Sequence, residues 1–181
     1  MPIYTKKGDD GTTGLPGKRR VRKDDPLIET LGSLDSSNAS IGVAITAISG
    51  KSELPNALRQ VQRDLLSIGA QLAAADGEKL EDSWLDRRTS EMESTIDRWD
   101  KALPPLANFI LPGGSAAGAS IHLARTFVRT AERNLNHLDS TNGKILRYIN
   151  RLSDFLFQAA RFANYSTGNS EEIWQYGKKS S

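Results

Sequence analysis

The sequence predicts an all-α protein, a five-helix antiparallel bundle with a short extended N-terminal segment and a glycine-rich loop. Three observations support this fold class. From Asp25 onward, apolar residues recur at three- and four-residue steps, which is the spacing of one helix face. The periodic stretches are long and are joined by short turns, which favours an antiparallel bundle. The residues before Asp25 contain too much glycine for a helix interior.

The N-terminal segment divides into two parts. Residues 2–5 form a short run typical of extended structure, and residues 8–14 form the glycine-rich loop. Five helices are then expected, at 26–48, 54–75, 80–101, 115–138 and 143–165. Asp25 is the predicted N-cap of the first helix, because Pro26 suits the first helical position.

Two of these helices carry clear apolar stripes, which we interpret as core. The stripe of the second helix consists of Leu58, Val61, Leu65, Ile68 and Leu72. The stripe of the fifth helix consists of Ile145, Ile149, Leu152, Leu156, Ala159 and Ala163. The third helix is more polar and is expected to end before Pro104-Pro105.

Composition narrows the class of protein. The chain has 181 residues, of which 38% are hydrophobic and 25% charged, as in soluble globular proteins. One domain, 1–181, is expected, with a loop segment 1–25, a bundle 26–165 and a tail 166–181. There is no cysteine, hence no disulfide framework and no thiolate metal site. No apolar run marks a secretory signal or a membrane span, so a cytoplasmic location and no membrane partner are expected.

Positive charge gathers near the N-terminus. The basic cluster consists of Lys18, Arg19, Arg20, Arg22 and Lys23. Such a cluster serves a phosphate-rich ligand, a nucleic acid or solubility alone. Aromatic residues do not interleave with it and the pI is about 8.9, so no nucleic-acid partner is expected.

The glycine-rich loop is a candidate anion site. Gly8, Gly11 and Gly14 allow the backbone to turn its N–H groups toward an anion, and the neighbouring threonine hydroxyls and lysines add donors. Neither a Walker A loop nor a Gly-x-Gly-x-x-Gly motif occurs. Asp9 and Asp10 suit Mg²⁺ bound mainly through a triphosphate. The alternative to an anion site is a plain surface turn, and the alternative to Mg²⁺ binding is that the two aspartates cap this turn.

Polar residues also line the last two helices. Arg125, Arg129, Glu132 and Arg133 share one face of the fourth helix, and Asn150 lies on the fifth. This pattern indicates a polyanion site, salt bridges between subunits, or a solvated face with intrahelical pairs. His122 and His137 lack the Glu-x-x-His spacing of di-iron bundles; we interpret His122 as a bundle-facing or surface residue.

Six motifs in order resemble the PduO-type ATP:cob(I)alamin adenosyltransferases. The N-terminal signature is the run from Tyr4 to Leu15, YTKKGDDGTTGL. The others are Val21-Arg22-Lys23, Gly32-Ser33-Leu34-Asp35 with Asn38, Phe109-Ile110-Leu111-Pro112-Gly113-Gly114, Ala124-Arg125-Thr126 through Arg129 to Ala131-Glu132-Arg133, and Ile149-Asn150-Arg151-Leu152-Ser153-Asp154. The resemblance covers residues 3–164.

This resemblance implies a homotrimer with sites between subunits, which transfers the 5′-deoxyadenosyl group of ATP to the cobalt of cob(I)alamin. Triphosphate leaves and adenosylcobalamin forms. Arg129, Phe109 and Asn150 would be catalytic, with Phe109 facing the corrinoid and excluding its lower ligand. Asp35 and Arg125 would form a salt bridge across the subunit interface. The implied ATP-binding residues are Thr5, Lys6, Gly8, Asp9, Gly11, Thr12, Thr13, Lys23, Arg129, Glu132, Arg133 and Asn150.

Two departures from the family pattern leave an alternative open. Ser36 stands where the family usually has an acid, and Thr130 where it usually has a second arginine. A non-catalytic sensor or escort that binds ATP or adenosylcobalamin is therefore the second hypothesis. A reductase and an adenosylcobalamin-dependent enzyme are expected partners. In the tail, Ile173, Trp174 and Tyr176 are expected to pack on the bundle or cover the corrin.

Overall fold

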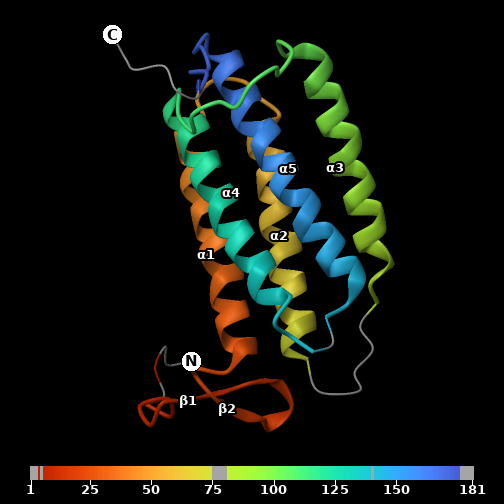
Figure 1. Cartoon of the computed structure of the whole chain (residues 1–181). Helices are drawn as coiled ribbons and strands as arrows, with labels where there is room; N and C mark the ends of the chain where they lie inside the picture. The colour runs from red at the N-terminus through yellow and green to blue at the C-terminus, as the bar shows by residue number, and fades with distance from the viewer. Residues whose placement is uncertain (1–3, 5, 75–80, 140, 176–181) are drawn as a thin grey trace.

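The structure is a helical bundle with a small β-hairpin at one end (Figure 1). The computed structural model describes residues 4, 6–74, 81–139 and 141–175 of the chain. Its elements are β1 (Thr12–Gly14), η1 (Pro16–Lys18), β2 (Arg20–Arg22), α1 (Pro26–Ala47), α2 (Leu54–Ala73), α3 (Ser83–Ala102), α4 (Ala116–Leu135) and α5 (Gly143–Ser166). The predicted all-α class with five helices is confirmed.

The hairpin was not expected from the sequence. β1 pairs with β2 in antiparallel register, with Thr13 opposite Val21. The connecting turn passes through Gly17, whose φ of 73° favours glycine. The dipeptide Pro16-Gly17 is the sequence signal for this turn. Of the expected extended run 2–5, only Tyr4 lies within the described residues, and it belongs to no strand.

The helix ends follow local hydrogen bonding. Asp25 is the N-cap of α1 as predicted, since its Oδ1 accepts from the backbone N–H of Leu27 at 2.8 Å. α3 begins at Ser83, three residues later than predicted. The backbone N–H of Ser83 donates to the carboxylate of Glu81 at 2.8 Å. α4 ends at Leu135 and not at 138, because the chain tightens there and Leu138 N–H donates to Leu135 O at 3.2 Å.

The helices are arranged around α4 and α5. α4 packs between α1 and α5, α2 packs on α1, and α3 packs on α5. Most of these neighbours are antiparallel, as predicted, but α3 and α5 run in the same direction (Figure 1). The reason is the connection 103–115, which crosses the end of the bundle before α4 returns. The hairpin lies at the opposite end, next to the start of α1.

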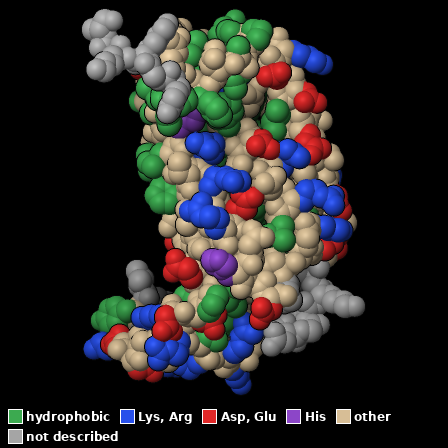
Figure 2. Space-filling view, viewed as in Figure 1, with side chains coloured by type: hydrophobic (Ala, Val, Ile, Leu, Met, Phe, Trp, Pro, Cys, Tyr) green, Lys and Arg blue, Asp and Glu red, His purple; other side chains and the backbone are tan. Residues whose placement is uncertain are grey.

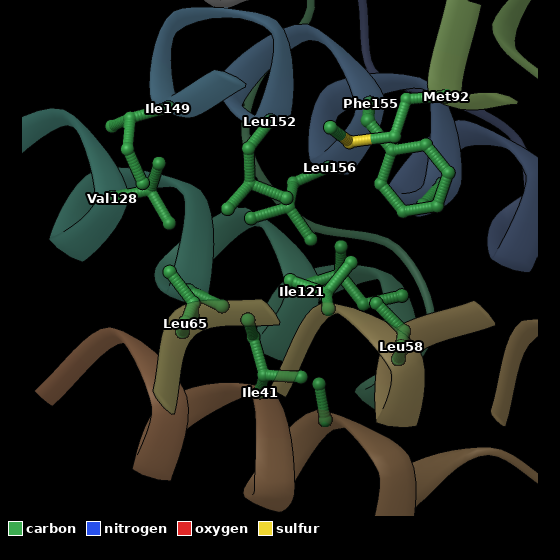
Figure 3. Packing of buried hydrophobic residues seen from close by; sticks show 14 of the residues in the cluster. Ile41, Leu58, Leu65, Met92, Ile121, Val128, Ile149, Leu152, Phe155 and Leu156 are labelled. Carbon is green, nitrogen blue, oxygen red and sulfur yellow. The ribbon is translucent and has the colours of Figure 1, made fainter. Parts of the chain in front are cut away.

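The predicted apolar stripes form the core (Figure 3). Every residue of the α5 stripe is buried, and so is the α2 stripe except for its last member, Leu72, which is half-buried. Burying one such leucine or isoleucine side chain contributes about 1.5–3 kcal/mol. Among the described residues, no helix combines the length and the apolar character needed to cross a bilayer.

Candidate functional site

The glycine-rich loop is a hydrogen-bonded turn closed by the hairpin. The backbone N–H of Lys23 donates to Gly11 O at 2.9 Å, and Gly11 has a φ of 82°. The carboxylate of Asp10 accepts from Thr12 N–H at 2.9 Å and from Thr12 Oγ1 at 2.7 Å. These hydrogen bonds lower the pKa of Asp10. Asp10 therefore caps the turn, as the alternative interpretation held.

Cationic side chains meet over this loop. A Cβ atom placed on Gly8 would lie 3.5 Å from Lys23 Nζ and 3.3 Å from Thr12 O, so the Lys23 ammonium sits close against the glycine backbone. Arg20 donates to Lys7 O and to Thr12 Oγ1, and its Nη2 lies 3.5 Å from Asp10 Oδ1. The turn thus presents two cationic side chains beside exposed backbone.

Arg20 is the residue that sequence reasoning missed. It was one member of a basic cluster without a role of its own, whereas the fold makes it the side chain that joins the loop to β2. Recognising the hairpin from Pro16-Gly17 would have placed Arg20 opposite Gly14 and near Thr12. That signal was present in the sequence.

The remaining predicted loop residues are distributed around the same turn. Lys6 and Asp9 are exposed, and Lys6 has the left-handed φ of 59°. Thr13 is half-buried within β1. Thr5 lies outside the described residues. No group of three or more histidine, cysteine or acidic side chains suited to a metal occurs in the described parts of the chain.

Arg129, Glu132 and Asn150 form a second cluster. Arg129 on α4 pairs with the carboxylate of Glu132 one turn later, so the predicted intrahelical pair is present. The other carboxylate oxygen of Glu132 accepts from Asn150 Nδ2 on α5 at 2.7 Å. Glu132 is 15% exposed and Arg129 is 46% exposed. The Arg129 guanidinium is therefore accessible from solvent, and a mostly buried carboxylate orients it.

Arg133 lies beside this cluster but bonds elsewhere. Its Nη2 donates to Thr130 Oγ1 at 3.0 Å, and Thr130 Oγ1 in turn donates to Thr126 O at 3.3 Å. Ser36 similarly donates to Gly32 O at 3.0 Å within α1. Ser36 and Thr130, the two departures from the family pattern, thus each hydrogen-bond to a backbone carbonyl of their own helix.

The loop and the second cluster are separate within one chain. Among the described residues, no hydrogen bond or ion pair joins loop residues 6–13 or Lys23 to Arg129, Glu132 or Asn150. The hairpin lies beyond the end of the bundle (Figure 1). Figure 2 shows basic side chains gathered on the hairpin and, apart from these, on the bundle face where α4 and α5 lie.

Asp35 and Arg125 do not pair with each other inside one chain. Asp35 is exposed on α1, and no ion pair within the described residues involves it. Arg125 is half-buried, and its Nε has no hydrogen-bond partner among the described residues. This buried Nε–H is a donor that an acceptor from outside the chain would satisfy.

Phe109 lies in the connection between α3 and α4, at the end of the bundle away from the hairpin. Its side chain is 80% exposed, the highest value among the large hydrophobic residues described. A phenylalanine this exposed contributes little to the core, which is consistent with contact to a ligand.

His122 is buried and faces the bundle, as one of the two interpretations predicted. It is 2% exposed, its ring centroid lies 5.8 Å from that of Phe157, and neither ring nitrogen has a partner among the described residues. Burial lowers the pKa of His122 to about 4 from its ordinary value of 6.5; Arg125 acts in the same direction and Glu171 opposes it. His137 is exposed near the end of α4.

We expect this histidine to make the protein less stable as the pH is lowered. Because the folded pKa lies below the unfolded one, the unfolded chain binds more protons between pH 6.5 and pH 4. The free energy of unfolding should therefore drop by up to about 3 kcal/mol as the pH is lowered through this window. Urea unfolding at pH 7.5, 5.5 and 4.5 measures it. His122→Leu should lack this component, and identical pH profiles for the two proteins would contradict the assignment.

The same fold occurs in solved structures. A variant PduO-type ATP:corrinoid adenosyltransferase from Lactobacillus reuteri, complexed with cobalamin and ATP, superposes with a TM-score of 0.91 at 34% identity, covering 98% of each chain. Another variant of that enzyme, complexed with ATP, gives a TM-score of 0.87 at 35% identity and covers 96% of this chain and 100% of the other. The fold is that of the PduO-type ATP:corrinoid adenosyltransferases.

Sequence comparison agrees with the fold. A corrinoid adenosyltransferase from Bacillus subtilis is 38% identical over 174 residues, covering 93% of this chain and 89% of that protein. A corrinoid adenosyltransferase from Mycobacterium tuberculosis is 37% identical over 187 residues, covering 97% and 93%. The profile of the cobalamin adenosyltransferase family matches residues 3–163. The chain belongs to the cobalamin adenosyltransferase family.

Proposed function

We propose that this cobalamin adenosyltransferase moves the 5′-deoxyadenosyl group of ATP to the cobalt of a reduced corrinoid, at sites shared between copies of the chain. Two groups of anion-binding residues that lie apart in one chain carry the proposal: the loop with Lys23, and Arg129 with Glu132 and Asn150. A polyphosphate needs both groups together, and a neighbouring copy supplies the missing half.

A homotrimer accounts for the surface of the bundle. Large apolar side chains remain exposed on the helices, including Val43 at 59%, Leu123 at 54% and Phe127 at 38%. A second copy would cover such residues. The buried Arg125 Nε and the exposed Asp35 provide a complementary pair for the same contact. Each site would then take its loop from one subunit and its helix face from the next.

The chemistry follows from charge and position. The reduced cobalt supplies an electron pair to the ribose C5′, the bond from C5′ to the triphosphate oxygen breaks, and triphosphate leaves with the negative charge. Arg129, Lys23 and the loop N–H groups stabilise that charge. Mg²⁺, bound through the phosphates and Asp9, would neutralise part of it. Asn150 would orient the nucleotide so that C5′ faces the cobalt.

Phe109 is the residue we assign to the corrinoid. An exposed aromatic ring at the end of the bundle provides an apolar surface for the corrin face. By occupying the lower face it would keep a donor ligand off the cobalt. Loss of that donor makes the cobalt easier to reduce to its nucleophilic state.

An anaerobic assay tests the function directly. The protein is mixed with MgATP and chemically reduced cobalamin, and the visible spectrum is followed for formation of the cobalt–carbon bond. We expect turnover with release of one triphosphate per adenosylcobalamin. Binding of ATP by calorimetry without any turnover would instead favour the sensor or escort hypothesis. A reductase partner, an adenosylcobalamin-dependent enzyme that receives the product, and a cytoplasmic location stay predictions.

A further inference from the structure

The C-terminal tail forms a short antiparallel pairing with the segment that carries Phe109. Ile110 and Ile173 face each other in a β-bridge. On either side, Leu111 N–H donates to Glu172 O and Trp174 N–H donates to Phe109 O, both at 2.8 Å. The backbone of Phe109 is therefore fixed by the tail.

The same pairing brings two exposed rings together. The centroids of Phe109 and Trp174 are 6.4 Å apart, with the ring planes at 74°. This is the edge-to-face arrangement in which aromatic rings attract each other. Trp174 is 47% exposed, so the pair forms an apolar surface toward solvent. Both rings line one open hollow of about 650 Å³, and hydrophobic side chains gather at this end of the molecule (Figure 2).

Part of the segment lies over a pocket, although Leu103 at its start belongs to the core. A cavity of about 480 Å³ lies between the connection 103–110 and the tail, lined by residues that include Leu103, Ile110, Tyr165 and Ile173. Phe109 thus projects from a segment that spans a cavity. Its position depends on whatever holds that segment at its edges.

Two buried side chains of α5 hold those edges. Arg161, which is 2% exposed, donates from Nε to Glu171 at 2.9 Å and from Nη2 to Pro104 O at 2.8 Å. Asn164 donates to Gly113 O at 2.9 Å and accepts from Ser115 N–H at 2.8 Å. The tail and both ends of the Phe109 segment are therefore tied to one helix, which leaves the Phe109 side chain itself to be fixed by Trp174.

We propose that Trp174 is a positioning residue for the transfer reaction, which holds the Phe109 ring in the orientation that meets the corrinoid. This inference rests on the proposed function, because it takes Phe109 as the corrinoid-facing ring. Trp174 restricts the rotamer of Phe109 from the side, while the β-bridge fixes its backbone. Without the indole, the phenylalanine ring would sample the open hollow beside it, and the productive orientation would be less populated.

The test is a double-mutant cycle with Trp174→Ala and Phe109→Ala. Trp174→Ala should lower kcat with reduced cobalamin by about 3- to 10-fold, the range expected for one aromatic pair, and leave KM for ATP unchanged. Trp174→Phe should recover most of the rate. In the Phe109→Ala background, Trp174→Ala should add little further loss. Cobalamin affinity, followed by absorbance, gives the same cycle when turnover is too slow to measure.

Controls separate this inference from the proposed function. Leu66→Ala removes an apolar side chain of α2 that is 65% exposed, against 47% for Trp174, and should leave kcat unchanged. If the kcat losses of Trp174→Ala and Phe109→Ala simply multiply in the double variant, the positioning role is overturned. A wild-type kcat in Trp174→Ala would overturn it as well. In both cases the transferase activity stands. A wild-type protein that makes no adenosylcobalamin would overturn the proposed function instead.

Discussion

Replacing Arg129 by alanine should lower kcat/KM for adenosyl transfer by about 10²- to 10³-fold, the loss typical of removing one donor that stabilises charge in a transition state. In the proposed reaction, negative charge builds up on the departing triphosphate. Arg129 is the guanidinium that α4 offers to it, oriented by the Glu132 carboxylate. Most of the loss should fall on kcat, since that charge develops only as the bond to C5′ breaks.

The fold should tolerate this substitution. Arg129 is 46% exposed, and an ion pair at such a position contributes about 0–1 kcal/mol to stability. Glu132 keeps its hydrogen bond from Asn150 Nδ2 at 2.7 Å, so its carboxylate is not left without a partner. Thermal or urea unfolding of the variant should therefore match wild type within about 1 kcal/mol.

Two further variants sharpen the test. Arg129→Lys retains the charge but loses the planar fork, and we expect a smaller loss than for alanine. Arg87→Ala removes an arginine of α3 that is 70% exposed and lies 3.9 Å from Glu91, so it serves as the matched control with unchanged kinetics. Wild-type kcat and KM in Arg129→Ala would rule out the assigned role.

The helical part of the fold could be predicted from sequence because its signals are repeated. Each turn of α2 and α5 places another apolar residue on the same face, so a few irregular positions do not obscure the pattern. Asp25 with Pro26 marked the start of α1 for an equally local reason. β1 and β2 have three residues each, too few for any alternation to emerge, and only the turn dipeptide indicated them.

For the candidate site, the sequence indicated the residue types involved but not which of them lie in contact. Glycines, lysines and arginines indicated anion binding by residue type alone, and the spacing of Arg129 and Glu132 indicated their pairing. The link from Glu132 to Asn150 joins two helices, so no spacing within one helix reveals it. The same holds for the bridge between Ile110 and Ile173, whose partners are far apart in sequence and belong to segments without periodicity. Contacts of this kind depend on tertiary packing.

A mixing experiment should distinguish a shared site from a site within one chain. Lys23→Glu places a negative charge beside Gly8 in the loop, and Arg129→Ala removes the guanidinium from α4. Each variant alone should be nearly inactive. Unfolding the two together in equal amounts and refolding them forms mixed oligomers. Activity should then return, because some sites receive the intact loop of one variant and the intact helix face of the other.

The size of the recovery is the decisive quantity. When subunits combine at random in a ring, a site draws an intact loop with a chance of one half and an intact Arg129 with the same chance, so about one site in four is complete. We therefore expect about a quarter of the wild-type rate, against a few per cent or less for either variant alone. If the loop and Arg129 served the same chain, every chain would carry one defect and mixing would restore nothing. Refolding each variant separately, and mixing only afterwards without denaturant, controls for activity that does not require exchange of subunits.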